Sequence, residues 1–297
     1  MLVIGQQPEA RWLQQMVYDE DYNAVFMYGG AAADKIFTDL WMLKDTTWKK
    51  LSDDGPALIK SAFAYDQGRK RTVLFGGSGD GGSVNETWEW DGNKWKQISV
   101  AAPPARNHPM AAYDKKNKVI IMFGGFGAGG ALSDTWTFDG RSWEQIDTSG
   151  PKNCLPHGMI YDETNERVIL VAVALSAPND SRARNEMWEW TGKSWRQLSY
   201  DAPTTSLNSL QALAEFGDNG IVLFDGDDIS RGNGKTWTFS QHHWTSEWLT
   251  GPSPRVGHAM VYDKSKNKTL LFGGTDRKKS FNDLWEWNGK AWRRISN

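Results

Sequence analysis

The sequence has a single cysteine, no long apolar run and no dominant charge, and each absence excludes a class of protein. Cys154 stands alone among 297 residues, so no internal disulfide can form and nothing supports an oxidising compartment. No apolar run approaches the roughly 20 residues that would span a bilayer. The 34 basic and 36 acidic residues give a net charge of −2, which disfavours nucleic acid and anionic membranes as partners.

The first ten residues, MLVIGQQPEA, lack the basic and long apolar regions of a signal peptide. We therefore expect a cytoplasmic, monomeric protein without membrane insertion. The alternative is a secreted protein whose leader has been removed.

Tryptophan, by contrast, is abundant and periodic. The chain has 17, and twelve of them form pairs separated by seven positions. Successive pairs begin 47, 48, 52, 49 and 48 residues apart, and a period near 50 is typical of propeller blades. The pairs are Trp41 and Trp48, Trp88 and Trp95, Trp136 and Trp143, Trp188 and Trp195, Trp237 and Trp244, and Trp285 and Trp292.

Each repeat predicts four strands. The first ends in Tyr-Asp, as at Tyr113, and the second is an apolar run that ends in an aromatic residue and a glycine pair. The third begins at the first tryptophan and alternates apolar with polar residues, the pattern of a half-buried strand. A glycine-containing turn leads to the fourth strand, which begins at the second tryptophan. We expect both tryptophans of each pair in the core.

The apolar run, the glycine pair and the two spaced aromatic residues resemble the kelch repeat, and NETWEWDGNKWKQIS is similar to bacterial members of that group. The resemblance covers about residues 8–297. It implies an all-β fold, a six-bladed kelch-type β-propeller with four antiparallel strands per blade, as a single domain over residues 1–297. The expected blades are approximately residues 8–55, 56–104, 105–151, 152–203, 204–252 and 253–297.

Two repeats depart from the pattern. In the fourth, Ala172 and Val173 replace the glycine pair. In the fifth, Tyr-Asp is missing and the first hairpin is two residues shorter. Ring closure has two possible forms, an added strand from residues 2–5 or packing of the last blade against the first.

A site would lie on the face that carries the loops after the second and fourth strands, where the innermost strand begins beside the central channel. We call this the loop face, and the opposite side, made of short turns, the hairpin face. Binding residues concentrate on loops held by a rigid scaffold.

Three arginines recur seven positions before the tyrosine of their repeats: Arg11, Arg106 and Arg255. An acidic residue stands two positions before the first tryptophan in five repeats, so inter-blade arginine–carboxylate latches would explain both features. The alternative is a ligand-binding arginine set at the channel mouth. We favour the latch, with at least one arginine left for ligand.

Three histidines, His108, His157 and His258, lie four or five positions before the tyrosine. A metal site would need all three to converge, and no tight ligand spacing supports one, so we expect no metal and no cofactor. The further ligand-binding candidates on the loop face are Trp12, Arg182, Arg184, Arg231, Trp248 and Arg277.

The sequence contains no nucleophile elbow, P-loop or paired-cysteine metal site. We therefore expect a non-catalytic binding module that uses the loop face and channel mouth for a protein, peptide or glycan. One alternative, which the resemblance suggests, is an isomerase similar to the sugar-acid mutarotases, with arginines for a carboxylate and a histidine for proton transfer. Another is a metal-dependent lyase or specifier-type kelch protein.

Overall fold

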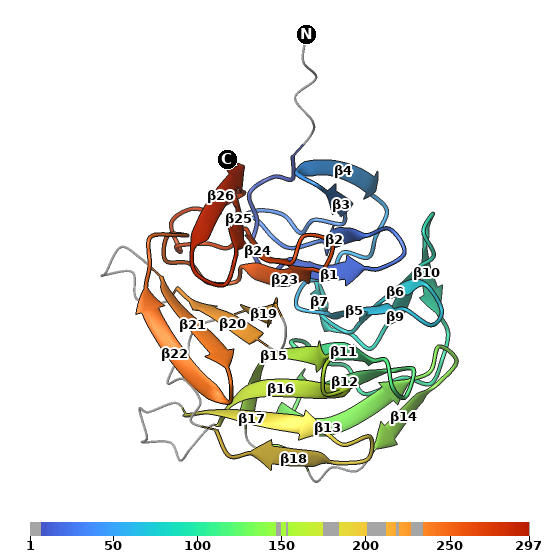
Figure 1. Cartoon of the computed structure of the whole chain (residues 1–297). Coiled ribbons are helices and arrows are strands. Elements are labelled where there is room, and N and C mark those ends of the chain that lie inside the picture. Colours follow the sequence, from blue (N-terminus) through green and yellow to red (C-terminus); the bar gives the residue numbers. More distant parts are fainter. Residues whose placement is uncertain are drawn as a thin grey trace.

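The computed structural model describes residues 7–146, 150–152, 154–174, 184–200, 212–217, 220–226 and 234–296. Its six four-stranded antiparallel sheets are arranged as blades around a central channel (Figure 1). The predicted six-bladed β-propeller is thus confirmed. In these described ranges, no helix is long and apolar enough to cross a membrane.

Each blade is one consecutive stretch of chain, and its strands pair in chain order from the channel outwards. Blades one and two contain β1 (Gln15–Asp19), β2 (Ala24–Tyr28), β3 (Leu40–Lys44) and β4 (Thr47–Ser52), then β5 (Ala62–Asp66), β6 (Arg71–Phe75), β9 (Thr87–Trp90) and β10 (Trp95–Ile98). A small hairpin of β7 (Ser78–Gly79) and β8 (Gly82–Ser83) lies in the loop after β6. Blades three and four contain β11 (Met110–Asp114), β12 (Val119–Gly127), β13 (Gly130–Phe138) and β14 (Trp143–Ile146), then β15 (Cys154–Asp162), β16 (Arg167–Ala174), β17 (Arg184–Trp190) and β18 (Trp195–Leu198). Blades five and six contain β19 (Ala212–Phe216), β20 (Gly220–Asp225), β21 (Lys235–Ser240) and β22 (His243–Trp248), then β23 (Ala259–Asp263), β24 (Lys268–Phe272), β25 (Leu284–Trp287) and β26 (Trp292–Ser296).

The glycine pair after the second strand marks a tight approach between two backbone segments. Gly30 has a φ of +97°, and a Cβ there would lie 2.9 Å from the carbonyl oxygen of Trp12. Only glycine fits both the positive φ and the short distance. In blade four Ala172 and Val173 take this position, and there the strand continues in regular pairing as far as Ala174, opposite Arg184.

The core is a set of apolar layers between neighbouring blades. The tryptophan that begins the fourth strand belongs to these layers. Trp143 is 8% exposed and donates its indole N–H to Thr87 of the preceding blade at 3.0 Å. Trp195 donates in the same way to Thr135 at 2.8 Å.

The tryptophan that begins the third strand is less buried than we expected. Trp136 is half-buried, and its indole N–H donates to Asp134, two residues earlier, at 2.7 Å. Trp188 is also half-buried and donates to Glu186 at 3.0 Å. This tryptophan lies deep in the core only in blade one, where Trp41 is 3% exposed.

The first and last blades meet as the others do. One apolar layer joins Val25, Met27 and Trp48 of blade one to Leu270 and Phe272 of blade six. Backbone hydrogen bonds also cross the junction, from Leu13 N to Gly257 O at 2.7 Å and from Gly274 N to Arg11 O at 2.8 Å. Packing of the last blade against the first therefore closes the ring, while residues 2–5 lie outside the described part.

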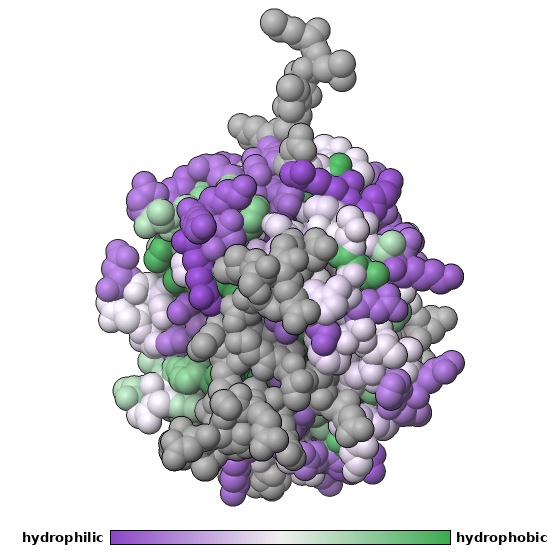
Figure 2. Space-filling model, turned by 90° about the vertical axis from the view of Figure 1, so that its left-hand side faces the viewer, coloured by the Kyte–Doolittle hydropathy of each residue, from purple (hydrophilic) through white to green (hydrophobic). Residues whose placement is uncertain are grey.

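The outside of the propeller is predominantly polar on the side drawn in Figure 2. Hydrophobic residues of the described chain are visible there as small, separate patches among hydrophilic ones (Figure 2). Trp248 and Tyr22, each 43% exposed, are the large hydrophobic side chains that stand out among the described residues.

Candidate functional site at the channel mouth

Four charged side chains close the channel at the hairpin face, and we call them the channel plug: Glu20, Lys115, Glu163 and Lys264. Each stands two positions after the tyrosine of its repeat, in the turn that follows the innermost strand. The ammonium of Lys115 lies 2.6 Å from a carboxylate oxygen of Glu20 and 2.6 Å from one of Glu163. Lys264 pairs with the same two carboxylates. The plug thus ties together blades one, three, four and six.

The plug holds its carboxylates ionised. Burial alone would raise the pKa of Glu20, but hydrogen bonds from Lys115 and Lys264 outweigh it, so the pKa is lowered. The pKa of Glu163 is lowered by the same two lysines against the same cost of burial. Charge-assisted hydrogen bonds of this kind are stronger than those between neutral groups.

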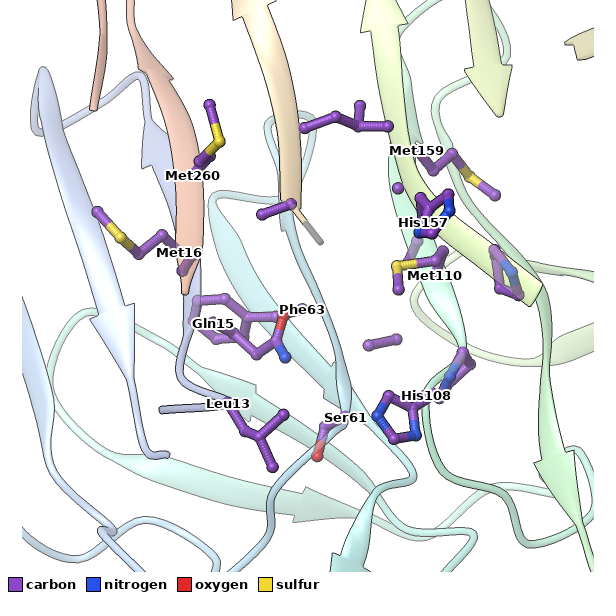
Figure 3. Close-up of a pocket in the computed structure, with 18 of the residues that line it drawn as sticks. Leu13, Gln15, Met16, Ser61, Phe63, His108, Met110, His157, Met159 and Met260 are labelled. Carbon is purple, nitrogen blue, oxygen red and sulfur yellow. The ribbon is translucent and has the colours of Figure 1, made fainter. Parts of the chain in front are cut away.

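The channel opens at the loop face into a cavity of about 250 Å³, which we call the mouth cavity. Its wall is formed by residues of all six innermost strands (Figure 3). The inner wall is largely apolar because five blades carry a large apolar side chain two residues before the position of the repeated tyrosine. These side chains are Met16, Phe63, Met159, Leu213 and Met260. In blade three, Met110, which stands one residue earlier than this position, also lines the cavity.

Polar side chains line the same cavity, at positions four and five residues before the tyrosine. The position four residues before the tyrosine carries Gln14, Ser61, His157 and His258. His108 stands one residue earlier than the other two histidines and has a φ of +53°. The structure therefore brings the three predicted histidines to one cavity.

Burial keeps these histidines neutral at physiological pH. It lowers the pKa of His108 to about 4, with a further effect of Lys60. It lowers the pKa of His157 to about 4 and, with Arg255 nearby, that of His258 to about 3. An imidazole with a pKa this low is a weak base at pH 7, which makes it a poor general base.

Two of the histidines have few hydrogen bonds at their rings. His258 is only 5% exposed, its ring has no side-chain partner among the described residues, and its one hydrogen bond is to the backbone of Arg255. Nδ1 of His108 forms a hydrogen bond with the side-chain oxygen of Asn107 at 2.8 Å, whereas Nε2 has no hydrogen-bond partner. His157 bonds the side chain of Asn185. Within the described residues, no three His, Cys, Asp or Glu side chains form a group that could hold a metal ion.

The structure buries the three arginine side chains among groups of their own blades rather than at the channel mouth. Arg11, Arg106 and Arg255 are at most 1% exposed. Arg106 donates two hydrogen bonds to the carboxylate of Asp134, at 2.6 and 2.8 Å, and one to the carbonyl of Gly124 at 3.1 Å. Arg11 with Asp39, and Arg255 with Asp283, repeat this bidentate arrangement.

These latches differ in two respects from what we expected. None of the three arginines is left for a ligand, because each holds an aspartate. The pairs are also not inter-blade pairs. Each arginine and its aspartate belong to the same blade, and the contact with the preceding blade is made by the arginine backbone. In blade three, Arg106 N donates to Val84 O at 3.1 Å, and Gly77 N donates to Arg106 O at 2.8 Å. Buried Leu58 and Cys154 take the arginine position in blades two and four. Burial raises the pKa of the Cys154 thiol to about 12.

Of the remaining predicted site residues, Trp12, Trp248 and Arg277 do not line the mouth cavity. Trp12 is half-buried and forms a β-bridge with Ala31. Trp248 is exposed at the end of β22, and its ring centroid lies 5.8 Å from the ammonium of Lys235. Arg277 is exposed in a turn where its backbone N–H bonds Thr275. Arg184 begins β17, while Arg182 and Arg231 lie outside the described residues.

Sequence reasoning did not single out the methionines of the mouth cavity or the plug. Both could have been found by counting from the repeated tyrosine. The plug residues stand two positions after it, as Glu20, Lys115, Glu163 and Lys264, with uncharged Gln67 at the same position of blade two. Alternating charges at equivalent positions of a closed ring must meet around its axis.

A closed ring of six four-stranded blades with a channel open at one end defines a β-propeller with its candidate site at the loop face. A family model described as the KLHDC2/KLHL20/DRC7 Kelch-repeats domain matches residues 1–173, more than half of the chain. The chain therefore belongs to this kelch-repeat family. The solved structure titled "Structure of YjhT" is similar to it, with a TM-score of 0.66, 14% sequence identity, and coverage of 97% of this chain and 98% of that chain. No curated protein matches the sequence.

Proposed function

We propose that this chain is a non-catalytic binding module that takes an uncharged, apolar side chain of a protein or peptide into the mouth cavity. The observation that carries the proposal is the wall of that cavity, in which four methionines, Phe63 and Leu213 surround the space. Ligand sites are characteristically apolar hollows with a few placed polar groups.

The size and polarity of the mouth cavity restrict the kinds of ligand that it can bind. Its volume of about 250 Å³ suits one large side chain better than a whole drug-sized molecule, for which about 300–1,000 Å³ is usual. Methionine side chains adapt to different apolar shapes. Ser61 and the imidazoles of His108, His157 and His258 give the wall the few polar side chains that such sites characteristically have.

The same observations disfavour an enzyme that handles a carboxylate. The arginines that would bind the carboxylate already hold Asp39, Asp134 and Asp283. The histidines at the mouth, with pKa values of about 3 to 4, are poor proton acceptors at neutral pH.

A test uses ¹³C-methyl methionine labelling, because Met16, Met110, Met159 and Met260 report directly on the mouth cavity. The probes are capped amino acids: N-acetyl leucinamide, methioninamide and phenylalaninamide, with the capped glutamate and lysine as charged controls. We expect the apolar probes alone to shift these methyl resonances.

Ala111→Leu provides the matched variant, since Ala111 is the small residue in the ring of large ones two positions before the tyrosine. Filling that space should abolish the shifts. Ala131→Leu, at an exposed position of β13, should leave them unchanged. Absence of a shift with every apolar probe would overturn the proposal, as would shifts that persist in Ala111→Leu.

A further inference from the structure

In four blades the repeated tyrosine fastens its blade to the one before. The tyrosine ring is buried, and its hydroxyl reaches the residue three positions after the tyrosine of the preceding blade. For example, the hydroxyl of Tyr113 accepts a hydrogen bond from Gly68 N at 3.1 Å. The four pairs are Tyr18 with Ser265, Tyr65 with Asp21, Tyr113 with Gly68 and Tyr161 with Lys116.

Blade five lacks this tyrosine. Ala212 pairs with Phe224 as Met110 pairs with Phe123 in blade three, which aligns the two innermost strands. Three residues further along, blade three has Tyr113 and blade five has Glu215. A carboxylate side chain is shorter than a phenol and cannot fill the same space.

A cavity of about 270 Å³ lies where the phenol is missing, between blades four and five, and we call it the inter-blade cavity. Its apolar wall includes Ile169, Met187, Ile221 and Phe239, and Glu215 lies at its inner side, next to the channel. Thr164 also lines it. Thr164 stands three positions after Tyr161, so it is the residue that a tyrosine of blade five would reach.

We propose that the inter-blade cavity binds a phenol ring, which takes the place of the missing tyrosine and directs its hydroxyl to the turn at Thr164. The space is sufficient, because an apolar cavity of about 150 Å³ already accommodates benzene. The apolar wall suits the ring, and the turn at Thr164 offers the hydroxyl the backbone surroundings that Gly68 offers Tyr113. This site is separate from the mouth cavity and does not depend on the function proposed for it.

The first experiment titrates p-cresol, the side-chain analogue of tyrosine, against ¹³C-methyl methionine-labelled protein. Met187 lines the inter-blade cavity, whereas Met110 lines only the mouth cavity. We expect p-cresol to shift the Met187 methyl resonance, to leave that of Met110 in place and to raise the melting temperature in a concentration-dependent manner. Toluene, which lacks the hydroxyl, should bind more weakly.

The decisive variant is Glu215→Tyr, which restores the repeat and fills the cavity from within. It should weaken p-cresol binding by a factor of about ten or more, a difference of at least about 1.4 kcal/mol. Glu247→Tyr introduces the same side chain at an exposed position of β22 and should leave binding unchanged. Tyr113→Ala opens an equivalent space between blades two and three, and p-cresol should recover part of the stability that this variant loses.

N-acetyltyrosinamide tests whether the bound phenol ring can belong to a tyrosine of a peptide or only to a free small molecule. A Met187 shift with p-cresol alone assigns a free small phenol, whereas a shift with both probes extends the site to a tyrosine side chain on a peptide. The proposal is overturned if p-cresol leaves the Met187 resonance of the parent unmoved, or if Glu215→Tyr binds p-cresol as tightly as the parent does.

Discussion

Arg106 and Asp134 form a bidentate ion pair inside the propeller, with the arginine side chain completely shielded from solvent. Removing one partner of such a pair leaves a buried charge without compensation. Because the backbone of the same arginine bonds the preceding blade, the ion pair also fixes the position of one blade relative to the next.

Arg106→Met should therefore lower the free energy of unfolding by up to about 3–5 kcal/mol, since half-buried Asp134 loses its counter-ion and keeps only the hydrogen bond from Trp136. Arg106→Lys keeps the charge but loses the two parallel hydrogen bonds, so its loss should be smaller. Urea unfolding of the three proteins measures both values. A Met variant as stable as the parent would contradict the latch.

The two tryptophans of one repeat should differ in their contribution to stability. Trp195→Ala removes a buried indole and its bond to Thr135, and should cost about 3–5 kcal/mol. Trp188→Ala, in the same blade, removes a half-buried ring and should cost clearly less. Equal losses in urea unfolding would show that the two positions are packed alike.

The channel plug should behave as one coupled unit, because Lys115 and Lys264 share the carboxylates of Glu20 and Glu163. Replacing one lysine by Met leaves the other to neutralise both acids. Replacing both should cost more than the sum of the single losses, by about 0.5–3 kcal/mol. A double-mutant cycle by urea unfolding tests this, with exposed Lys49→Met as the second site of a control cycle that should be additive.

Glu215 should make the stability of the protein depend on pH. Burial raises the pKa of its carboxyl to about 7, against the opposing effect of Lys264, while an unfolded glutamate has a pKa of about 4.3. The folded protein binds more protons between these values, so stability falls as the pH rises from about 4.3 to 7.

Glu215→Gln removes this dependence, so the variant should melt above the parent at pH 8, with the gap closing towards pH 4.5. Thermal unfolding over that range is the measurement, and Glu144→Gln, at an exposed position of β14, is the matched control. A gap between Glu215→Gln and the parent that widens as the pH falls would contradict the assignment.

Much of the fold follows from the sequence because the repeat fixes both strand order and register. Counting from Tyr113 gives the end of the innermost strand, its second-strand partner and the position of Arg106. The sequence also predicts the partner of that arginine, the aspartate two positions before the first tryptophan. It does not predict that the two belong to the same blade, because this spacing does not show whether the side chain or the backbone of the arginine faces the neighbouring blade.

The site was harder to predict than the fold. The spacing of His108 differs by one residue from that of His157 and His258, and this difference moves it to a position with positive φ. Sequence alone shows neither this change nor the low pKa values, because both arise from the surroundings that other blades supply. The inter-blade cavity depends likewise on a residue, Glu215, that the pattern of the first strand does not mark.

Because each blade is one uninterrupted stretch of chain and the last packs on the first as any neighbours do, the ring has no unique seam. Circular permutants that open between any two blades should build the same six sheets, and whole repeats could be duplicated or exchanged during evolution without rewriting a dedicated closing element.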